Sequence, residues 1–315
     1  MNTRPLRELA VTELGLGGSS VGNLFHAITD DDAHSTIDAA WAGGVRCFDT
    51  APHYGLGLSE LRLGRALKDR HRDDYVISTK VGRLLEPNPA PTGSDITAGG
   101  FDVPDTYRRR FDFSRDGICR SLDASLTRLG LDRVDIVYLH DPDDHLDEAI
   151  SEGLPALTEL GDQGVIRAMG VGMNDWAAPL RILRESDLDV VMLAGRWTLL
   201  DRSGAPLIAE CERRGIPIVA AAPFNSGLLA RDRRDDDATY DYAPAPPDIR
   251  TRVQELADLC HRFDIPLPAA ALQYPLRSAA VTSVVCGFRT ATEVDSALDN
   301  LARTIPPAAW TRLAA

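Results

Sequence analysis

The sequence predicts an α/β fold, a (β/α)8 TIM barrel that forms a single domain over residues 1–315 and carries long loops at its C-terminal rim. Short runs rich in β-branched residues alternate with longer segments of helical period along the whole chain. Eight such βα units fit the 315 residues. A doubly wound sheet is the alternative, but such a sheet usually has fewer strands and a phosphate-binding loop at its first turn.

The βα units follow one another without a linker. The first four are predicted, in order, at strand 14–18 with helix 32–42, strand 45–49 with helix 59–68, strand 75–80 with helix 114–129, and strand 134–140 with helix 146–163. The last four are predicted at strand 166–171 with helix 175–185, strand 188–193 with helix 206–214, strand 217–221 with helix 248–263, and strand 281–286 with helix 292–302. Ser59 and Ser114 stand at helix starts, where a side-chain oxygen caps free N–H groups, and Gly130 and Gly215 stand at helix ends.

Two long segments interrupt this rhythm, residues 84–113 after the third strand and residues 223–247 after the seventh. Both are rich in proline, aspartate and other turn-forming residues, and long loops without regular structure are often functional. Because both follow strand C-termini, we expect them to cover substrate or cofactor at one rim of the barrel. The alternative is that they are tolerated surface insertions.

Composition and charge exclude several classes of function. The formal net charge is −13 and the basic residues are scattered, so nucleic acid is not an expected partner. The N-terminus lacks a secretory signal, and no segment has the roughly twenty apolar residues of a membrane span. The five cysteines are widely spaced, which favours reduced thiols over a disulfide framework. We therefore expect a cytoplasmic protein without a membrane partner.

Three predicted strands end in charged or proton-transferring residues, namely Asp49, Lys80 and His140, and Tyr54 follows shortly after the first of them. Neighbouring barrel strands share a rim, so these side chains are expected to meet there. An ammonium lowers the pKa of an adjacent tyrosine, which is ordinarily near 10, and a carboxylate holds the lysine in place. Such a group can move a proton at a carbonyl while a nicotinamide carries the hydride. Each residue alone is also typical of a turn or a solvated strand end.

The sequence segments around these residues identify a protein family more specifically than the spacing of the residues does. The matching segments are Phe48-Asp49-Thr50-Ala51-Pro52-His53-Tyr54-Gly55, Ser78-Thr79-Lys80, and Asp135-Ile136-Val137-Tyr138-Leu139-His140. Together they resemble the aldo-keto reductase family from about Leu14 to Leu301. The resemblance implies a barrel, a nicotinamide cofactor, no metal, and a catalytic tetrad of Asp49, Tyr54, Lys80 and His140 in which Tyr54 is the general acid/base.

Further segments narrow the resemblance to one branch of the family. Residues 111–117, 140–145 and 222–229 are similar to the branch that includes L-fucose, D-threo-aldose and pyridoxal dehydrogenases, which oxidise cyclic hemiacetals. This implies a small-molecule substrate, a sugar or a pyridoxal-like compound, that becomes a lactone. A general NADPH-dependent aldehyde or ketone reductase is the runner-up, and a non-catalytic nicotinamide-binding regulatory subunit is a third hypothesis. The oligomeric state is not predicted.

The cofactor pocket departs from the common pattern of the family. The residues that correspond to cofactor-binding positions, or that lie beside them, are Asn174, Phe224, Ser226, Gly227, Leu228, Gly287, Arg289 and Glu293. The carboxylate of Glu293 would repel the 2′-phosphate of NADP, whereas Arg289 could pair with it. We therefore expect NAD in preference to NADP.

The substrate is expected to contact His53, Phe113 and Trp197, although the last two could instead pack under a loop.

Two other patterns in the sequence are misleading. Residues 15–20 resemble a dinucleotide fingerprint but carry serine at the place of the third glycine. Residues 140–145 are rich in metal-ligand types, but they are consecutive and run past a proline, which favours a turn that enters a helix.

Overall fold

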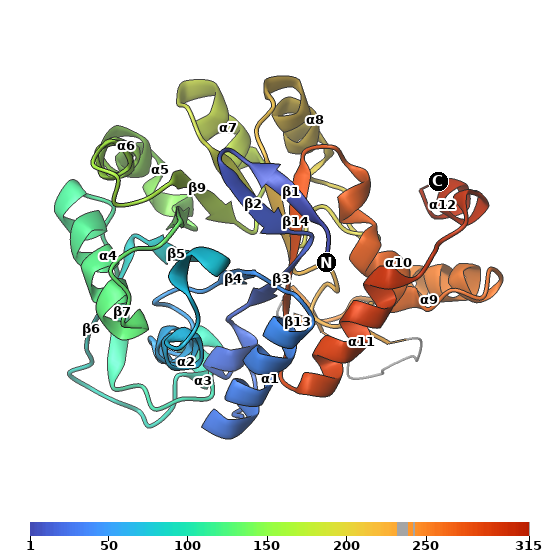
Figure 1. Ribbon diagram of the computed structural model, residues 1–315, viewed down its shortest axis with the longest axis horizontal. Coiled ribbons are helices and arrows are strands. Elements are labelled where there is room, and N and C mark those ends of the chain that lie inside the picture. The colour runs from blue at the N-terminus through green and yellow to red at the C-terminus, as the bar shows by residue number, and fades with distance from the viewer. Residues whose placement is uncertain (232–238, 242, 315) are drawn as a thin grey trace.

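The computed structural model describes residues 1–231, 239–241 and 243–314, and its centre is a closed parallel barrel (Figure 1). The barrel strands, in their order around it, are β3 (Leu14–Gly17), β4 (Cys47–Asp49), β5 (Val76–Val81), β8 (Ile136–His140), β9 (Ala168–Met173), β10 (Val190–Ala194), β11 (Ile218–Ala221) and β14 (Val281–Gly287). Strands that are consecutive in the barrel are parallel throughout. The predicted (β/α)8 barrel is confirmed.

Helices surround the barrel (Figure 1). They are α1 (Asp30–Ala42), α2 (Leu58–Leu67), α4 (Arg115–Leu129), α5 (Leu146–Glu148), α6 (Leu154–Asp162), α7 (Ala177–Glu185), α8 (Ala205–Arg214), α9 (Pro247–His261), α10 (Leu267–Gln273), α11 (Ala291–Ala302) and α12 (Pro307–Leu313). The predicted helix 146–163 contains a π-helical turn at Ala149–Gly153. Pro155 lies just beyond this turn and has no N–H to donate, which explains the irregular backbone there. Helices α10 and α12 were not predicted.

An N-terminal hairpin, also not predicted, covers the end of the barrel opposite the functional rim. It consists of β1 (Thr3–Leu6) and β2 (Leu9–Thr12), which pair antiparallel and lie across the barrel in Figure 1. Its buried side chains Leu6, Leu9 and Val11 pack with residues of the barrel interior such as Val76 and Ile136. Because this apolar hairpin closes one end of the barrel, a polar site can form only at the other, C-terminal end.

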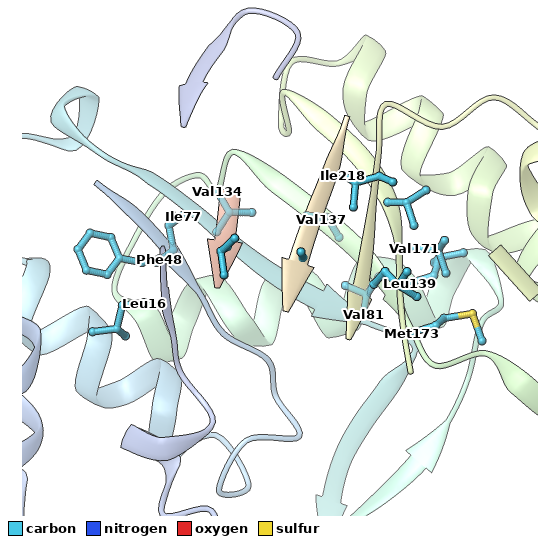
Figure 2. Close-up of a cluster of buried hydrophobic side chains, with 14 of the residues drawn as sticks. Leu16, Phe48, Ile77, Val81, Val134, Val137, Leu139, Val171, Met173 and Ile218 are labelled. Carbon is cyan, nitrogen blue, oxygen red and sulfur yellow. The ribbon is translucent and has the colours of Figure 1, made fainter. Parts of the chain in front are cut away.

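The two-residue alternation of the strands decides which side chains enter the barrel. On β5, Ile77 and Val81 belong to the apolar cluster between barrel and helices, part of which Figure 2 shows. Lys80, between Thr79 and Val81, therefore faces the interior. The same alternation turns Asp49 and His140 inward, because their neighbours Phe48 and Leu139 belong to the outer cluster.

The two long segments at the rim have structure of their own. Segment 84–113 contains most of an antiparallel hairpin, β6 (Arg83–Pro87) with β7 (Tyr107–Phe111), and the short helix α3 (Ile96–Gly99). The prediction of an irregular loop is wrong here. Segment 223–247 contains the small hairpin β12 (Thr239–Tyr240) with β13 (Ala243–Pro244), and residues 232–238 and 242 lie outside the described part. None of the helices in the described ranges combines the length and apolar composition that a bilayer span requires.

Candidate active site

Asp49 and Lys80 form a buried ion pair inside the C-terminal end of the barrel. Lys80 Nζ donates to Asp49 Oδ2 at 2.5 Å and to the carbonyl oxygen of Thr50 at 3.1 Å. The hydroxyl of Ser78 donates to the other oxygen of Asp49 at 2.7 Å. Burial acts to lower the pKa of Lys80, but the charges and hydrogen bonds of Asp49 and Tyr54 together outweigh it and the pKa is raised. Lys80 is therefore a cation at neutral pH.

Tyr54 lies directly beside this ion pair. Lys80 Nζ is 4.6 Å from the centroid of the tyrosine ring. Burial raises the pKa of Tyr54 to about 12, and the nearby ammonium offsets only part of this effect. Lys80 lowers the pKa of Tyr54 as expected, but the expectation of a net pKa below the ordinary value is wrong, because burial has the larger effect. At neutral pH the phenol carries its proton.

His140 completes the group of four. Its ring meets the ring of Tyr54 edge-on, with centroids 5.8 Å apart. His140 Nε2 lies 3.5 Å from Asp141 Oδ2, whereas Nδ1 is buried and has no hydrogen-bond partner. Burial, together with the cations Arg83 and Lys80, holds the pKa of His140 well below its usual range. The structure therefore brings the four predicted residues together with a neutral imidazole.

The hairpin β6–β7 and helix α3 add charged residues that the sequence did not indicate. Arg83 pairs with Asp141 at 2.5 Å, and Arg109 pairs with Asp95 through two hydrogen bonds of 2.6 Å. Arg109 Nε also donates to Nδ1 of His53. The aromatic residues Tyr107 and Phe111 are typical of a strand, but the three consecutive arginines between them conceal this signal in the sequence.

A cavity of about 800 Å³ opens at the ends of β11 and β14 and at the start of α11. Its lining includes seven of the predicted cofactor residues, namely Phe224, Ser226, Gly227, Leu228, Gly287, Arg289 and Glu293. A Cβ at position 287 would lie 2.4 Å from Ser20 Oγ, so a larger residue there would have to displace the Ser20 side chain. Arg289 Nε is buried without a partner. The volume, the glycine and the unpartnered guanidinium nitrogen fit a dinucleotide.

The carboxylate of Glu293 is anchored at the first turn of α11. Its Oε2 accepts the backbone N–H of Arg289 at 2.7 Å, and the Glu293 N–H donates to Thr290 Oγ1 at 3.2 Å. The first bond holds the negative charge of Glu293 against the backbone of Arg289, where both residues line the cavity. Both residues that bear on the choice between NAD and NADP thus line the cavity.

Comparisons with known proteins agree with this geometry. The sequence profile of the Aldo/keto reductase family matches residues 13–315. The chain belongs to this family. It is 47% identical to a D-threo-aldose 1-dehydrogenase from a Pseudomonas species over 97% of this chain and 94% of that protein. It is 38% identical to a pyridoxal 4-dehydrogenase from Microbacterium luteolum, again over 97% and 94% of the two chains.

A solved structure supports the same assignment. The holo form of an aldo-keto reductase from Bacillus halodurans superimposes with a TM-score of 0.77 and 27% identity, and the match covers 99% of this chain and 96% of that one. The protein is accordingly an NAD(P)-dependent oxidoreductase of the aldo/keto reductase family, and the resemblance to the branch with D-threo-aldose 1-dehydrogenase and pyridoxal 4-dehydrogenase is confirmed.

The remaining predicted residues of this aldo/keto reductase lie elsewhere. Asn174 is exposed beyond β9 and does not line the cavity. Phe113 is 0% exposed and packs against Phe111, so it lies under the loop and does not line a cleft. Trp197 is half-buried against Tyr274, with ring centroids 5.6 Å apart. His53 is the one predicted substrate residue next to the tetrad, because its ring lies 6.0 Å from that of Tyr54.

Proposed function

We propose that this aldo/keto reductase oxidises the anomeric carbon of an aldose, in its cyclic hemiacetal form, to a lactone. The observation that carries the proposal is the 47% identity to D-threo-aldose 1-dehydrogenase over almost the full length of both chains. The polar side chains around Tyr54 support it as well, since a sugar presents several hydroxyl groups to be hydrogen-bonded. Arg83 and His53 would provide donors for them.

Tyr54 would act as the proton acceptor for the anomeric hydroxyl. The O–H bond breaks toward the phenolate oxygen, the C1–H bond gives up its electron pair as hydride, and a C=O bond forms, so that the hemiacetal becomes a lactone. A bound nicotinamide cofactor supplies the hydride acceptor. Lys80 favours the phenolate, and Asp49 keeps Lys80 charged and oriented. Neutral His140 can orient the hydroxyl or carbonyl oxygen of the substrate.

The proposed cofactor is NAD. Phe224, Gly287, Arg289 and Glu293 would hold it in the 800 Å³ cavity. The anchored carboxylate of Glu293 disfavours a 2′-phosphate, whereas Arg289 would favour one. We give Glu293 more weight, because a hydrogen bond from the backbone N–H of Arg289 holds its carboxylate in place. Steady-state titrations with NAD and NADP test this, and a higher kcat/KM with NADP would contradict it.

A substrate panel tests the proposed reaction. Formation of reduced cofactor is followed with L-fucose, D-arabinose, L-galactose and pyridoxal at mildly alkaline pH, with Tyr54→Phe as the inactive control. A higher kcat/KM for one of the three aldoses than for pyridoxal supports the proposal. Preferred turnover of pyridoxal would favour the second candidate, pyridoxal oxidation, which rests on the 38% identical relative. Reduction of simple aldehydes alone, or cofactor binding without any turnover, would overturn both.

A further inference from the structure

His53 is held by an ion pair that comes from the rim hairpin. Arg109, on β7, donates from Nε to His53 Nδ1 and from Nη2 to the His53 carbonyl oxygen at 3.2 Å. Asp95, which precedes α3, binds both terminal nitrogens of Arg109 at 2.6 Å. The side chains of Arg109 and Asp95 are 12% and 3% exposed. Such a buried, bidentate pair has a defined geometry, so Arg109 fixes both the ring and the carbonyl group of His53.

This contact determines where the proton of His53 lies. A guanidinium nitrogen only donates, so Nδ1 of His53 must accept, and a neutral imidazole then carries its proton on Nε2. Burial and the nearby cations, Arg109 first among them, hold the pKa of His53 well below its usual range. The free ring nitrogen of His53 is thus a hydrogen-bond donor at neutral pH.

The position of His53 places this donor beside the reacting end of the site. Its ring centroid lies 6.0 Å from that of Tyr54 and 5.6 Å from that of His140. The ring is braced edge-on against Phe101 at 5.1 Å, and the residue remains half-buried. In a cyclic aldose, the hydroxyl closest to the anomeric hydroxyl that meets Tyr54 is the one on the adjacent carbon, C2.

We propose that Arg109, held by Asp95, is a positioning residue that fixes His53 as an Nε2–H donor to the C2 hydroxyl of the aldose. This proposal rests on the proposed function, because it takes an aldose as the substrate. According to this proposal, the hairpin β6–β7 provides the selectivity for a hydroxyl next to the reacting carbon. Arg109 of this hairpin lies 56 positions from His53 in the sequence. Within the described part of the chain, the hydrogen bonds of Arg109 go to His53 and Asp95, and none goes to Tyr54 or His140.

Gly99 leaves the space that the ion pair occupies. A Cβ at this position would lie 2.4 Å from Arg109 Nη2 and 2.4 Å from Asp95 Oδ2. Gly99→Ala therefore displaces the pair without removing either charge. This provides a second variant that perturbs the grip on His53 by an independent route.

The kinetic test compares D-arabinose with 2-deoxy-D-ribose, which differ only in the C2 hydroxyl. A site built to hydrogen-bond a hydroxyl discriminates strongly against the analogue that lacks it, so the enzyme should prefer D-arabinose by about tenfold or more in kcat/KM. His53→Phe, Arg109→Met and Gly99→Ala should each lower this ratio to about threefold or less. Arg108→Met is the matched control, since Arg108 is an exposed neighbour on β7 and its ratio should not change.

A loss of kcat/KM by the same factor for both sugars would show that Arg109 has only a structural role and would overturn the proposal. A ratio that is lost in His53→Phe but retained in Arg109→Met and Gly99→Ala would also overturn it. If the unmodified enzyme turns over neither sugar but oxidises pyridoxal, the proposed aldose reaction fails, and the C2-hydroxyl assignment fails with it. The tautomer of His53 is then still decided by the following measurement.

NMR of protein labelled with 15N-histidine reports the tautomer without any substrate. The His53 signals are assigned by their loss in His53→Phe. The groups around the ring that bear on its charge are Arg109, Arg83, Lys80, Asp95, Tyr54 and His140. We expect an Nε2–H tautomer that does not titrate between about pH 6 and 8, and a titration that moves up toward this window in Arg109→Met. A proton on Nδ1, or an unchanged spectrum in Arg109→Met, would refute the role of Arg109.

Discussion

Lys80 Nζ lies 4.6 Å from the centroid of the Tyr54 ring, so the ammonium that is paired with Asp49 also faces the phenol. Two opposing effects act on Tyr54. Burial favours the neutral phenol, and the ammonium favours the phenolate. Burial is the larger effect, and the pKa of Tyr54 is about 12. The proposed oxidation, which needs a proton acceptor, should therefore depend strongly on pH.

We predict that kcat/KM for aldose oxidation increases as the pH rises from about 7 to 10, because the fraction of ionised Tyr54 grows below its raised pKa. Lys80→Met removes the cation that lowers this pKa, so the rising limb should shift to still higher pH. A pH profile of both proteins measures the shift. Lys68→Met, at an exposed position, is the control. A flat profile over this range in the unmodified enzyme would exclude Tyr54 as the group that titrates.

Tyr54→Phe separates proton transfer from binding. The substitution keeps the ring beside His140 and Phe101 but removes the hydroxyl, so kcat should fall by about 10²–10⁴-fold. The affinity for the cofactor, measured by quenching of protein fluorescence, should change little, because Tyr54 does not line the 800 Å³ cavity. An equal loss of affinity and kcat would instead indicate a disturbed site.

The sequence predicts those parts of the site that depend on local pattern. Asp49, Lys80 and His140 could be placed together because two-residue alternation and parallel strands bring strand ends to one rim. The grip of Arg109 on His53 could not be predicted in this way, because it depends on the register of β6 with β7. The raised pKa of Tyr54 also escaped prediction, since burial is a property of the packed site and the sequence shows only the neighbouring lysine.

The choice of cofactor should respond to the charge at Glu293. Glu293→Gln keeps an oxygen that can accept the Arg289 N–H but removes the negative charge, while Arg289 remains. The ratio of kcat/KM for NADP to that for NAD should rise by about tenfold, an effect of the size expected for one charge contact near solvent. Asp295→Asn, at an exposed position on α11 outside the cavity lining, should leave the ratio unchanged. No change in Glu293→Gln would show that the carboxylate does not select against the 2′-phosphate.

Glu60 links the strand that carries Lys80 to the surrounding helices. The side chain is 0% exposed, and its two oxygens accept from Thr79 Oγ1 at 2.8 Å and from Arg128 Nε at 2.6 Å. It thereby joins α2, β5 and α4. Breaking a buried pair by removing one partner leaves the other charge uncompensated, so Glu60→Leu should lower the free energy of unfolding by about 3–5 kcal/mol.

Chemical denaturation measures this loss, and Glu159→Gln is the control, because its ion pair with Arg115 is exposed and should contribute little. Thr79 faces the helices while Lys80 faces the barrel interior, so the effect on stability should be larger than the effect on kcat of the folded enzyme. If Glu60→Leu abolished turnover while its free energy of unfolding stayed unchanged, Glu60 would have to act on the chemistry and not on the fold.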